Sequence, residues 1–362
     1  LVSFIRDDFG ISNALAGAIT TLPLIAFALL SPFAPKLANK IGMERTIAIS
    51  LILLIAGILI RSASGIELLF TGTLLVGLAI AIGNVLMPGI IKMNFPYKIG
   101  LMTGLYAIVM NVFGALGSGL SIPIATSGNL GWRGSLVIWG GLALITLIIW
   151  LPQLAKKHNA KKNINNQQIG GLFRSSLAWK ITVFMGSQSL IFYTLITWLP
   201  TILMANGYDI HLAGWGVFIF QFASIPFTFI IPIIADKMKN QVLIAFISSL
   251  LIIIGLVGLL AGLSDLSILW IILLGAGNGS AFSLSMMFFT LRTRDGYEAA
   301  ELSGMAQSFG YLLAAFGPVM VGGLQDISGS WTLPLTLLAG VSVLMLLMGV
   351  ASGKNRQVSK NA

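Results

Sequence analysis

Amide and aromatic side chains interrupt several long apolar runs of the sequence, and hydrogen bonding is the chemistry that they could supply. Asn84 lies four residues before Pro88, which cannot donate the backbone hydrogen bond that the Asn84 carbonyl would accept. A carbonyl and a side-chain amide are therefore both available there. Comparable side chains in other apolar runs are Gln188, Tyr193, Thr197, Trp198 and Asn278, with Asn111 and Gln307 in neighbouring runs. Because polar groups in hydrocarbon are costly unless they meet partners or water, this clustering favours a polar cavity.

Each of these side chains also has a purely structural interpretation. Asn84 would serve equally well in an interhelical hydrogen bond that fixes packing. Tyr193 and Trp198 have the amphipathic rings that anchor helices at a membrane–water interface. The residue types alone leave binding and packing open for every member of the set.

The apolar runs hold no groups for covalent or metal chemistry. No Asp or Glu lies inside any of them, and His158 and His211 fall in connecting segments. The sequence has no Cys, which excludes disulfides and thiolate metal sites. Without paired carboxylates, a metal cluster or a nucleophile beside a base, we expect a protein that is not an enzyme and has no metal or cofactor. A coupling proton is a candidate partner, although the apolar runs hold no acid to carry it.

The composition predicts an all-α integral membrane protein. Hydrophobic residues make up 57% of the 362-residue chain and charged residues 9%. Runs of about 20 apolar residues cross a bilayer as helices. Eleven such spans are predicted at residues 13–33, 46–60, 68–91, 101–125, 133–151, 178–204, 212–234, 242–262, 266–290, 302–323 and 331–351.

A long internal repeat organises these spans. Residues 15–40 recur as residues 212–237, and Gly104 pairs with Gly304 further along the chain. The pairing shifts the pattern by six spans and so predicts two parallel half-bundles. It leaves the sixth span without a partner, so we expect a further helix before Leu1 and twelve in the parent protein. The predicted parts are an N-terminal half-bundle at 1–151, a linker at 152–177, a C-terminal half-bundle at 178–352 and a tail at 353–362.

The basic residues predict the orientation. The loops alternate between two faces, and all of the 21 Lys and Arg residues except Arg6, Arg61 and Arg133 fall on one face. By the positive-inside rule that face is cytoplasmic, which places the linker and the C-terminus in the cytoplasm of a cell-membrane protein. The net charge of +10 is thus a topology signal and gives no reason to expect a nucleic-acid partner.

Two further features have competing interpretations. Residues 275–279, Gly-Ala-Gly-Asn-Gly, are similar to part of a phosphate-binding loop. No strand precedes them and no Lys-Ser/Thr pair follows, so close helix packing is the better interpretation. Lys92 ends the third span, where snorkelling to the membrane surface is favoured over contact with a substrate.

The whole chain resembles the major facilitator superfamily, through its parallel six-plus-six arrangement and the charged loop between the second and third helices of each half. That superfamily's loop signature contains an Asp-Arg/Lys pair, one residue, a Gly and basic residues. The matching residues here are Asn39, Lys40, Gly42 and Arg45 in the first copy and Asp236 and Lys237 in the second, with Asn39 standing where the signature has Asp. The resemblance implies that these residues latch the cytoplasmic side.

Further strings resemble the cyanate and nitroimidazole permease branch of that superfamily. They are residues 83–88 (Gly-Asn-Val-Leu-Met-Pro), residues 185–189 (Met-Gly-Ser-Gln-Ser), Trp198-Leu199-Pro200 and residues 302–307 (Leu-Ser-Gly-Met-Ala-Gln). The implied substrate is a small organic anion or a compact polar heterocycle, such as cyanate or a nitroimidazole.

The resemblance implies a monomeric secondary transporter whose halves expose a central site alternately to the two faces. It also implies that the third, sixth and ninth visible spans, which carry Asn84, Gln188 and Asn278, line that cavity. Multidrug efflux is the main alternative within transport. A non-transporting membrane receptor or scaffold is the alternative of another class.

Overall fold

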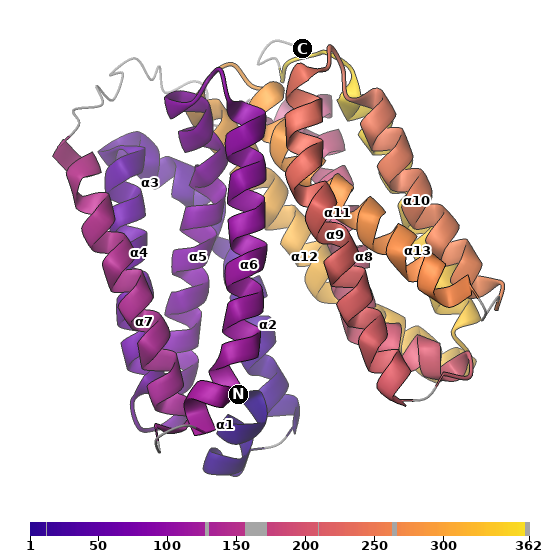
Figure 1. Ribbon diagram of the computed structural model, residues 1–362. Coiled ribbons are helices and arrows are strands. Elements are labelled where there is room, and N and C mark those ends of the chain that lie inside the picture. Colours follow the sequence, from indigo (N-terminus) through magenta and orange to yellow (C-terminus); the bar gives the residue numbers. More distant parts are fainter. Residues whose placement is uncertain (12, 127–129, 156–171, 209, 263–265, 359–362) are drawn as a thin grey trace. The chain divides into compact units, whose positions relative to one another are not determined.

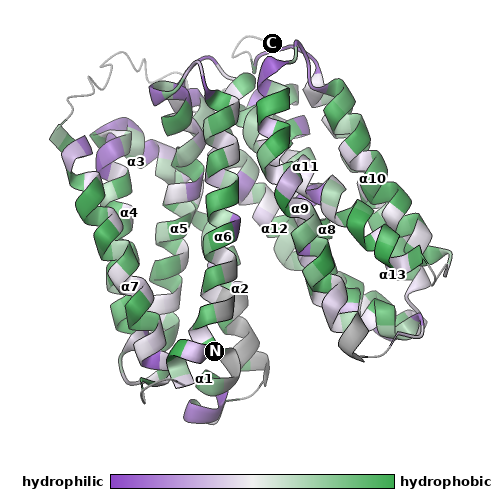
Figure 2. Cartoon of the chain, viewed as in Figure 1, coloured by the Kyte–Doolittle hydropathy of each residue, from purple (hydrophilic) through white to green (hydrophobic). Residues whose placement is uncertain are grey.

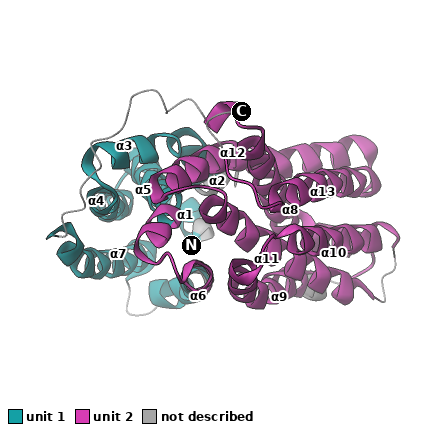
Figure 3. Ribbon diagram, turned by 90° about the horizontal axis from the view of Figure 1, so that it is seen from above, with its two compact units in different colours: residues 1–87, 109–165 teal, residues 88–108, 166–362 magenta. Residues whose placement is uncertain are grey.

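The computed structural model describes residues 1–11, 13–126, 130–155, 172–208, 210–262 and 266–358, and these residues form helices and short connections without any strand (Figure 1). Contacts between the helices divide the chain into two compact units (Figure 3). Unit 1 comprises residues 1–87 and 109–165, and unit 2 comprises residues 88–108 and 166–362. The units differ from the predicted half-bundles because residues 88–108, the end of one helix and the start of the next, belong to unit 2.

Unit 1 is built from seven helices, two of which continue into unit 2. They are α1 (Val2–Phe9), α2 (Asn13–Leu30), α3 (Phe33–Ile41), α4 (Met43–Ser62), α5 (Ile66–Asn94), α6 (Ile99–Thr126) and α7 (Gly131–Trp150). The helices α4 and α7 pack along each other, and α3 packs on α4. A short 3-10 helix, Leu151–Ala155, follows α7, and the larger part of the predicted linker lies outside the described residues.

The first predicted span does not run straight into a loop. Helix α2 ends at Leu30, and α3 begins at Phe33 at an angle of 56° to the preceding segment. Pro32 lies at this break. It favours the break because proline has no backbone N–H to continue a helix and its ring crowds the preceding turn. Asn39 and Lys40, expected in a loop, therefore lie on the short helix α3, which is a correction to the sequence-based prediction.

One end of unit 1 is held by a small apolar cluster beside an ion pair. Ile5, Leu69, Trp132 and Leu136 form the buried cluster. Next to it the Asp8 carboxylate accepts a hydrogen bond from Trp132 Nε1 at 3.2 Å and pairs with the Arg133 guanidinium at 2.9 Å. These contacts join α1, α5 and α7, so they hold α1 against the other two helices.

Unit 2 contains the six helices of the second repeat together with the α5–α6 tip, residues 88–108. The six are α8 (Ser176–Ala205), α9 (Ile210–Lys237), α10 (Val242–Leu260), α11 (Ser267–Leu291), α12 (Gly296–Ser328) and α13 (Thr332–Gly353). The main helix pairs are α8 with α12, α9 with α11, α10 with α11 and α10 with α13. Ser175 caps the start of α8 and Asp295 caps the start of α12, since each side chain accepts a backbone hydrogen bond three residues on.

Glycines allow α11 to approach its neighbours closely. A Cβ added at Gly275 would lie 2.3 Å from the Phe220 carbonyl oxygen of α9, and one at Gly279 would lie 2.5 Å from the Ser224 carbonyl oxygen. Gly277 faces α10 in the same way, at 2.7 Å from the Ser248 carbonyl oxygen. The structure thus confirms that the glycine-rich segment 275–279 is a helix-packing element and that it is not a phosphate loop.

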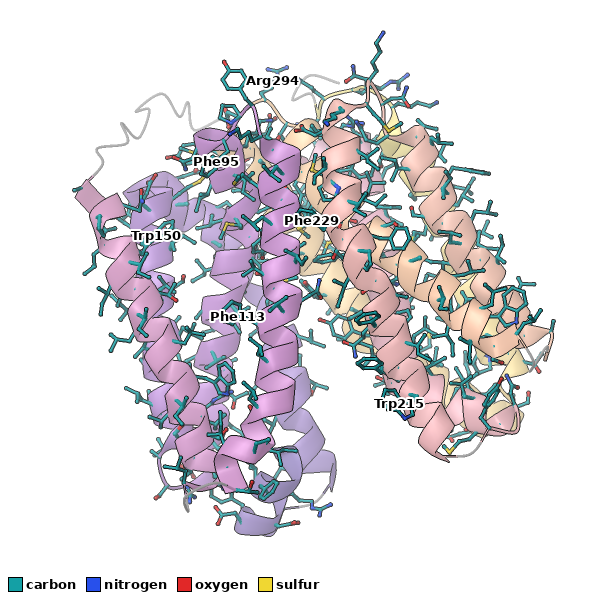
Figure 4. All side chains as sticks on the ribbon, in the orientation of Figure 1. Phe95, Phe113, Trp150, Trp215, Phe229 and Arg294 are labelled. Atoms are coloured by element: carbon teal, nitrogen blue, oxygen red, sulfur yellow. The ribbon has the colours of Figure 1, made fainter. Side chains whose placement is uncertain are left out.

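The helices are apolar along most of their length, with hydrophilic residues gathered at their ends (Figure 2). Each of the eleven predicted spans coincides with a helix. Nine helices in the described part of the chain are long and apolar enough to cross a membrane, or ten if α2 and α3 count as one bent span. Phe95 and Arg294 lie at one end of unit 2, and Trp215 lies at the other (Figure 4).

Candidate substrate-binding site

Two of the predicted binding residues form a buried amide pair in unit 2. Gln188 of α8 donates from Nε2 to Asn278 Oδ1 of α11 at 2.7 Å, and the Ser189 hydroxyl donates to Gln188 Oε1 at 3.2 Å. Both amide side chains are only 2% exposed. The Asn278 Nδ2 group has no hydrogen-bond partner among the described residues. Since nearly all buried polar groups are paired, an unpaired amide donor in the apolar interior is a candidate contact for a ligand oxygen.

An aromatic pair joins α8, the helix of Gln188, to α12. The Tyr193 ring of α8 meets the Tyr311 ring of α12 edge to face, with centroids 6.4 Å apart and planes at 68°. Tyr106 of the α5–α6 tip lies close enough to interact electrostatically with Tyr311. Sequence reasoning selected Tyr193 as a candidate, but a tyrosine in an apolar run does not reveal which rings it meets. Rings meet edge to face because the positive edge of one ring is attracted to the negative face of the other.

The remaining predicted residues of unit 2 make hydrogen bonds to other parts of the unit. Trp198 donates from Nε1 to the Pro318 carbonyl at 2.8 Å and its ring meets that of Trp331 at 5.6 Å, so it ties α8 to α12 and α13. Thr197 is exposed and donates to the Tyr193 carbonyl of its own helix at 2.8 Å. Gln307 is buried and donates to the Ser303 hydroxyl one turn earlier at 2.8 Å.

Asn84 and Asn111 belong to unit 1. They lie on α5 and α6, and both side chains are half-buried. Helix α5 continues past Pro88, so the proline predicted to free the Asn84 carbonyl is accommodated within an unbroken helix.

The predicted gating residues lie at helix ends. Asp236, in the last turn of α9, accepts a hydrogen bond from the Gly100 backbone N–H at the start of α6, at 3.1 Å. A carboxylate at a helix N-terminus satisfies an orphan N–H and interacts favourably with the helix dipole. Lys237 beside it is exposed, as are Lys40 and Arg45 in unit 1.

Two buried charged residues were missed by sequence reasoning. Arg292 follows α11, is 2% exposed, and donates to the carbonyls of Ser352 and Gly353 and to the Gln241 side chain. Burial lowers the pKa of Arg292 to about 10. Glu298, in the first turn of α12, is buried and accepts from the Arg294 backbone N–H at 2.6 Å. Arg292 was counted only among the basic residues of one membrane face, and the sequence has no signal that separates a buried helix-end charge from an exposed one.

The described residues contain no cluster of three or more His, Cys, Asp or Glu residues that could hold a metal ion. The groups that the Gln188–Asn278 and Tyr193–Tyr311 pairs bring together are amides, a serine hydroxyl and aromatic rings.

The sequence matches the Major Facilitator Superfamily over residues 1–318. The chain belongs to this superfamily. Its members are transporters, which confirms that the protein is a multi-pass membrane transporter of small molecules and not an enzyme.

Three relatives place this major facilitator transporter more closely. It is 46% identical over 359 residues to the uncharacterized transporter YycB of Bacillus subtilis, covering 99% of this chain and 89% of that one. It is 40% identical over 359 residues to the 2-nitroimidazole transporter of Escherichia coli, covering 99% and 91%. It is 25% identical over 351 residues to the cyanate transport protein CynX of the same species, covering 96% and 91%. These matches confirm the resemblance to the cyanate and nitroimidazole permease branch.

A solved structure agrees on the fold. The proton:xylose symporter XylE superimposes with a TM-score of 0.79 at 14% sequence identity, over 99% of this chain and 92% of that chain. The predicted fold class of a major-facilitator helix bundle is confirmed by this likeness.

Proposed function

We propose that this transporter carries a small, flat, polar molecule, a nitroimidazole-like heterocycle or a small organic anion, across the cell membrane by alternating access. The observation that carries the proposal is the unpaired Asn278 amide in the buried Gln188–Asn278 pair. A nitro, carboxylate or cyanate group offers an acceptor for this amide. Burying a polar donor without a partner costs about 1–3 kcal/mol, so a ligand that pairs it recovers that free energy.

Two further observations support a flat ligand. The Tyr193–Tyr311 pair offers ring edges and hydroxyl groups. The 40% identical relative is a transporter of 2-nitroimidazole, a flat ring with a nitro group. Asn84 and Asn111 of unit 1, and Thr197, Trp198 and Gln307 of unit 2, remain proposed substrate contacts, to be tested one at a time.

Thermal unfolding of the purified protein with candidate ligands tests the proposal. A ligand that binds only the folded state stabilises it by RT ln(1 + [L]/Kd), about 2.7 kcal/mol at one hundred times Kd. We expect 2-nitroimidazole to raise the melting temperature and imidazole, which lacks the nitro group, to leave it unchanged. Stabilisation by cyanate and not by 2-nitroimidazole would assign the substrate to the class of small anions. Stabilisation by bulky apolar drugs alone would favour multidrug efflux.

We propose the orientation in which the linker and the C-terminus are cytoplasmic, supported by the asymmetry of Lys and Arg. The chain has no Cys, so single cysteines introduced at Lys161 and at Tyr208 report on one position each. In intact cells an impermeant maleimide should label Tyr208→Cys and spare Lys161→Cys. Labelling of Lys161→Cys from outside would reverse the orientation.

A further inference from the structure

Arg61 is a charged residue on the buried side of a membrane-spanning helix of unit 1. It lies in the last turn of α4, which is long and apolar enough to cross a membrane. Ile58, in the turn before, is 5% exposed, whereas its neighbour Leu59 is 53% exposed. Successive residues of a helix are about 100° apart around its axis, which places Arg61 on the side of Ile58 and opposite Leu59. The arginine therefore faces the interior of unit 1.

The Arg61 guanidinium has no partner among the residues that the structure describes. Its Nε atom is buried and makes no hydrogen bond. The described residues form two ion pairs, Arg6 with Asp7 and Arg133 with Asp8. Neither pair includes Arg61. Charged residues within membrane spans are costly and almost always pair with another group or mark the path of an ion or substrate. Arg61 is thus a charge that calls for a partner from outside these residues.

The root of the Arg61 side chain is held in place and its tip is open. A Cβ added at Gly72 of α5 would lie 2.6 Å from the Arg61 Cβ and equally 2.6 Å from the Gly57 carbonyl oxygen, so the two helices meet closely at this point. The Arg61 side chain as a whole is half-buried, and of its three nitrogens only Nε is both buried and unpaired. The two terminal nitrogens therefore reach the surface. A donor held at its root and open at its tip is preorganised for a ligand.

The chemistry of this donor suits an oxyanion. A guanidinium is planar, keeps its charge at physiological pH and presents two N–H groups side by side, which match the two oxygens of a carboxylate or phosphate. The exposed apolar face of α4 carries Ile52 and Leu59, and Arg61 lies on the other side. A lipid phosphate that arrives along the exposed face is therefore less well placed than a small anion from the water.

We propose that Arg61 is the centre of a second binding site, which takes a small water-soluble oxyanion at the end of unit 1 that the proposed orientation makes external. The site shares no residue with the Gln188–Asn278 pair of unit 2, so it is independent of the substrate proposed above. The unpaired charge destabilises the free protein, because burying a charge without a partner is unfavourable. The bound anion neutralises that charge.

Melting temperatures of the purified protein in detergent test the site, and they do not depend on the orientation in the membrane. Potassium phosphate and potassium acetate are compared with potassium chloride at equal ionic strength. We expect each oxyanion to raise the melting temperature by about 2–4 °C over chloride. Arg61→Met should melt about 2–4 °C above the unsubstituted protein in chloride, since it removes an uncompensated charge. The same variant should lose most of the response to the oxyanions.

Arg133→Met is the matched control. Arg133 belongs to the same unit, but its guanidinium pairs with Asp8 at 2.9 Å and lies 4.6 Å from the Trp132 ring centroid. Its Nε is also buried and unpaired, so the two arginines differ chiefly in the acid partner. Arg133→Met should lower the melting temperature in chloride, because it leaves the Asp8 carboxylate without its cation. Its response to phosphate and acetate should be that of the unsubstituted protein.

Three results would overturn the proposal. A lower melting temperature of Arg61→Met in chloride, or failure of both Arg61→Met and Arg61→Gln to fold, would make Arg61 a residue that the fold requires. An equal response to the oxyanions in Arg61→Met and the unsubstituted protein would show that the anions act elsewhere. Stabilisation by added phosphatidylglycerol and by neither phosphate nor acetate would assign Arg61 to a lipid headgroup.

Discussion

We expect most molecules of the Gly275→Ala variant to fail to fold. The added methyl group would lie 2.3 Å from the Phe220 carbonyl oxygen and 2.9 Å from the Ala223 Cβ. Neither atom can rotate away, so α9 and α11 would have to separate along their seam. Overpacking costs about 1–3 kcal/mol even where side chains can adjust. Here the cost also exceeds the roughly 1 kcal/mol that alanine gains over glycine in a helix. The yield of monodisperse protein in detergent measures the effect.

Gly340→Ala is the matched control. Gly340 also lies inside a spanning helix, α13, but a Cβ there would have no atom within 4 Å. The same helix-propensity gain applies without the clash, so we expect an unchanged or slightly raised melting temperature. Equal behaviour of the two variants would contradict the assignment of residues 275–279 to helix packing.

Asn278→Leu is expected to weaken 2-nitroimidazole binding about tenfold or more. The substitution removes the unpaired Nδ2 donor, and a ligand oxygen left without its hydrogen bond costs about 1–3 kcal/mol. It also removes the acceptor of Gln188 Nε2, so some loss of stability should accompany it. Gln188→Leu breaks the same pair and leaves Asn278 in place. The ratio of the two dissociation constants, from calorimetric titration, separates ligand contact from packing.

Ser285→Ala serves as the control for Asn278→Leu. Ser285 is equally buried on α11, and its hydroxyl donates to the Ala281 carbonyl of its own helix at 2.9 Å. Loss of this local bond should leave the dissociation constant unchanged. If Asn278→Leu bound 2-nitroimidazole as tightly as Ser285→Ala does, the amide pair would be a packing element only.

Much of the fold could be predicted because lipid permits few solutions. Every backbone polar group in a bilayer must be satisfied internally, so apolar runs of about 20 residues become helices. The eleven predicted spans coincide with helices for this reason. The bend at Pro32 was missed because apolar composition continues through it while the backbone hydrogen bonds do not.

The residue types of the candidate site could be predicted from the sequence, but the contacts that each residue makes could be predicted less well. Asn278 and Gln188 were selected as costly polar groups, and the structure brings them into one hydrogen bond. Trp198 was selected on the same grounds, yet its ring and N–H are used to tie three helices together. Lys92 was misjudged because its ammonium donates to the Thr290 and Thr293 carbonyls and to the Thr293 hydroxyl after the last turns of α11, and such acceptors carry no signature in the sequence.

Counterflow in proteoliposomes tests whether this chain transports a nitroimidazole-like molecule. Vesicles are loaded with unlabelled 2-nitroimidazole, and labelled 2-nitroimidazole is added outside. We expect a transient accumulation of label above the level of protein-free vesicles, reduced in Asn278→Leu and retained in Ser285→Ala. If vesicles with the folded, unsubstituted protein took up no more label than vesicles without it, while another solute did undergo counterflow, transport of 2-nitroimidazole would be contradicted.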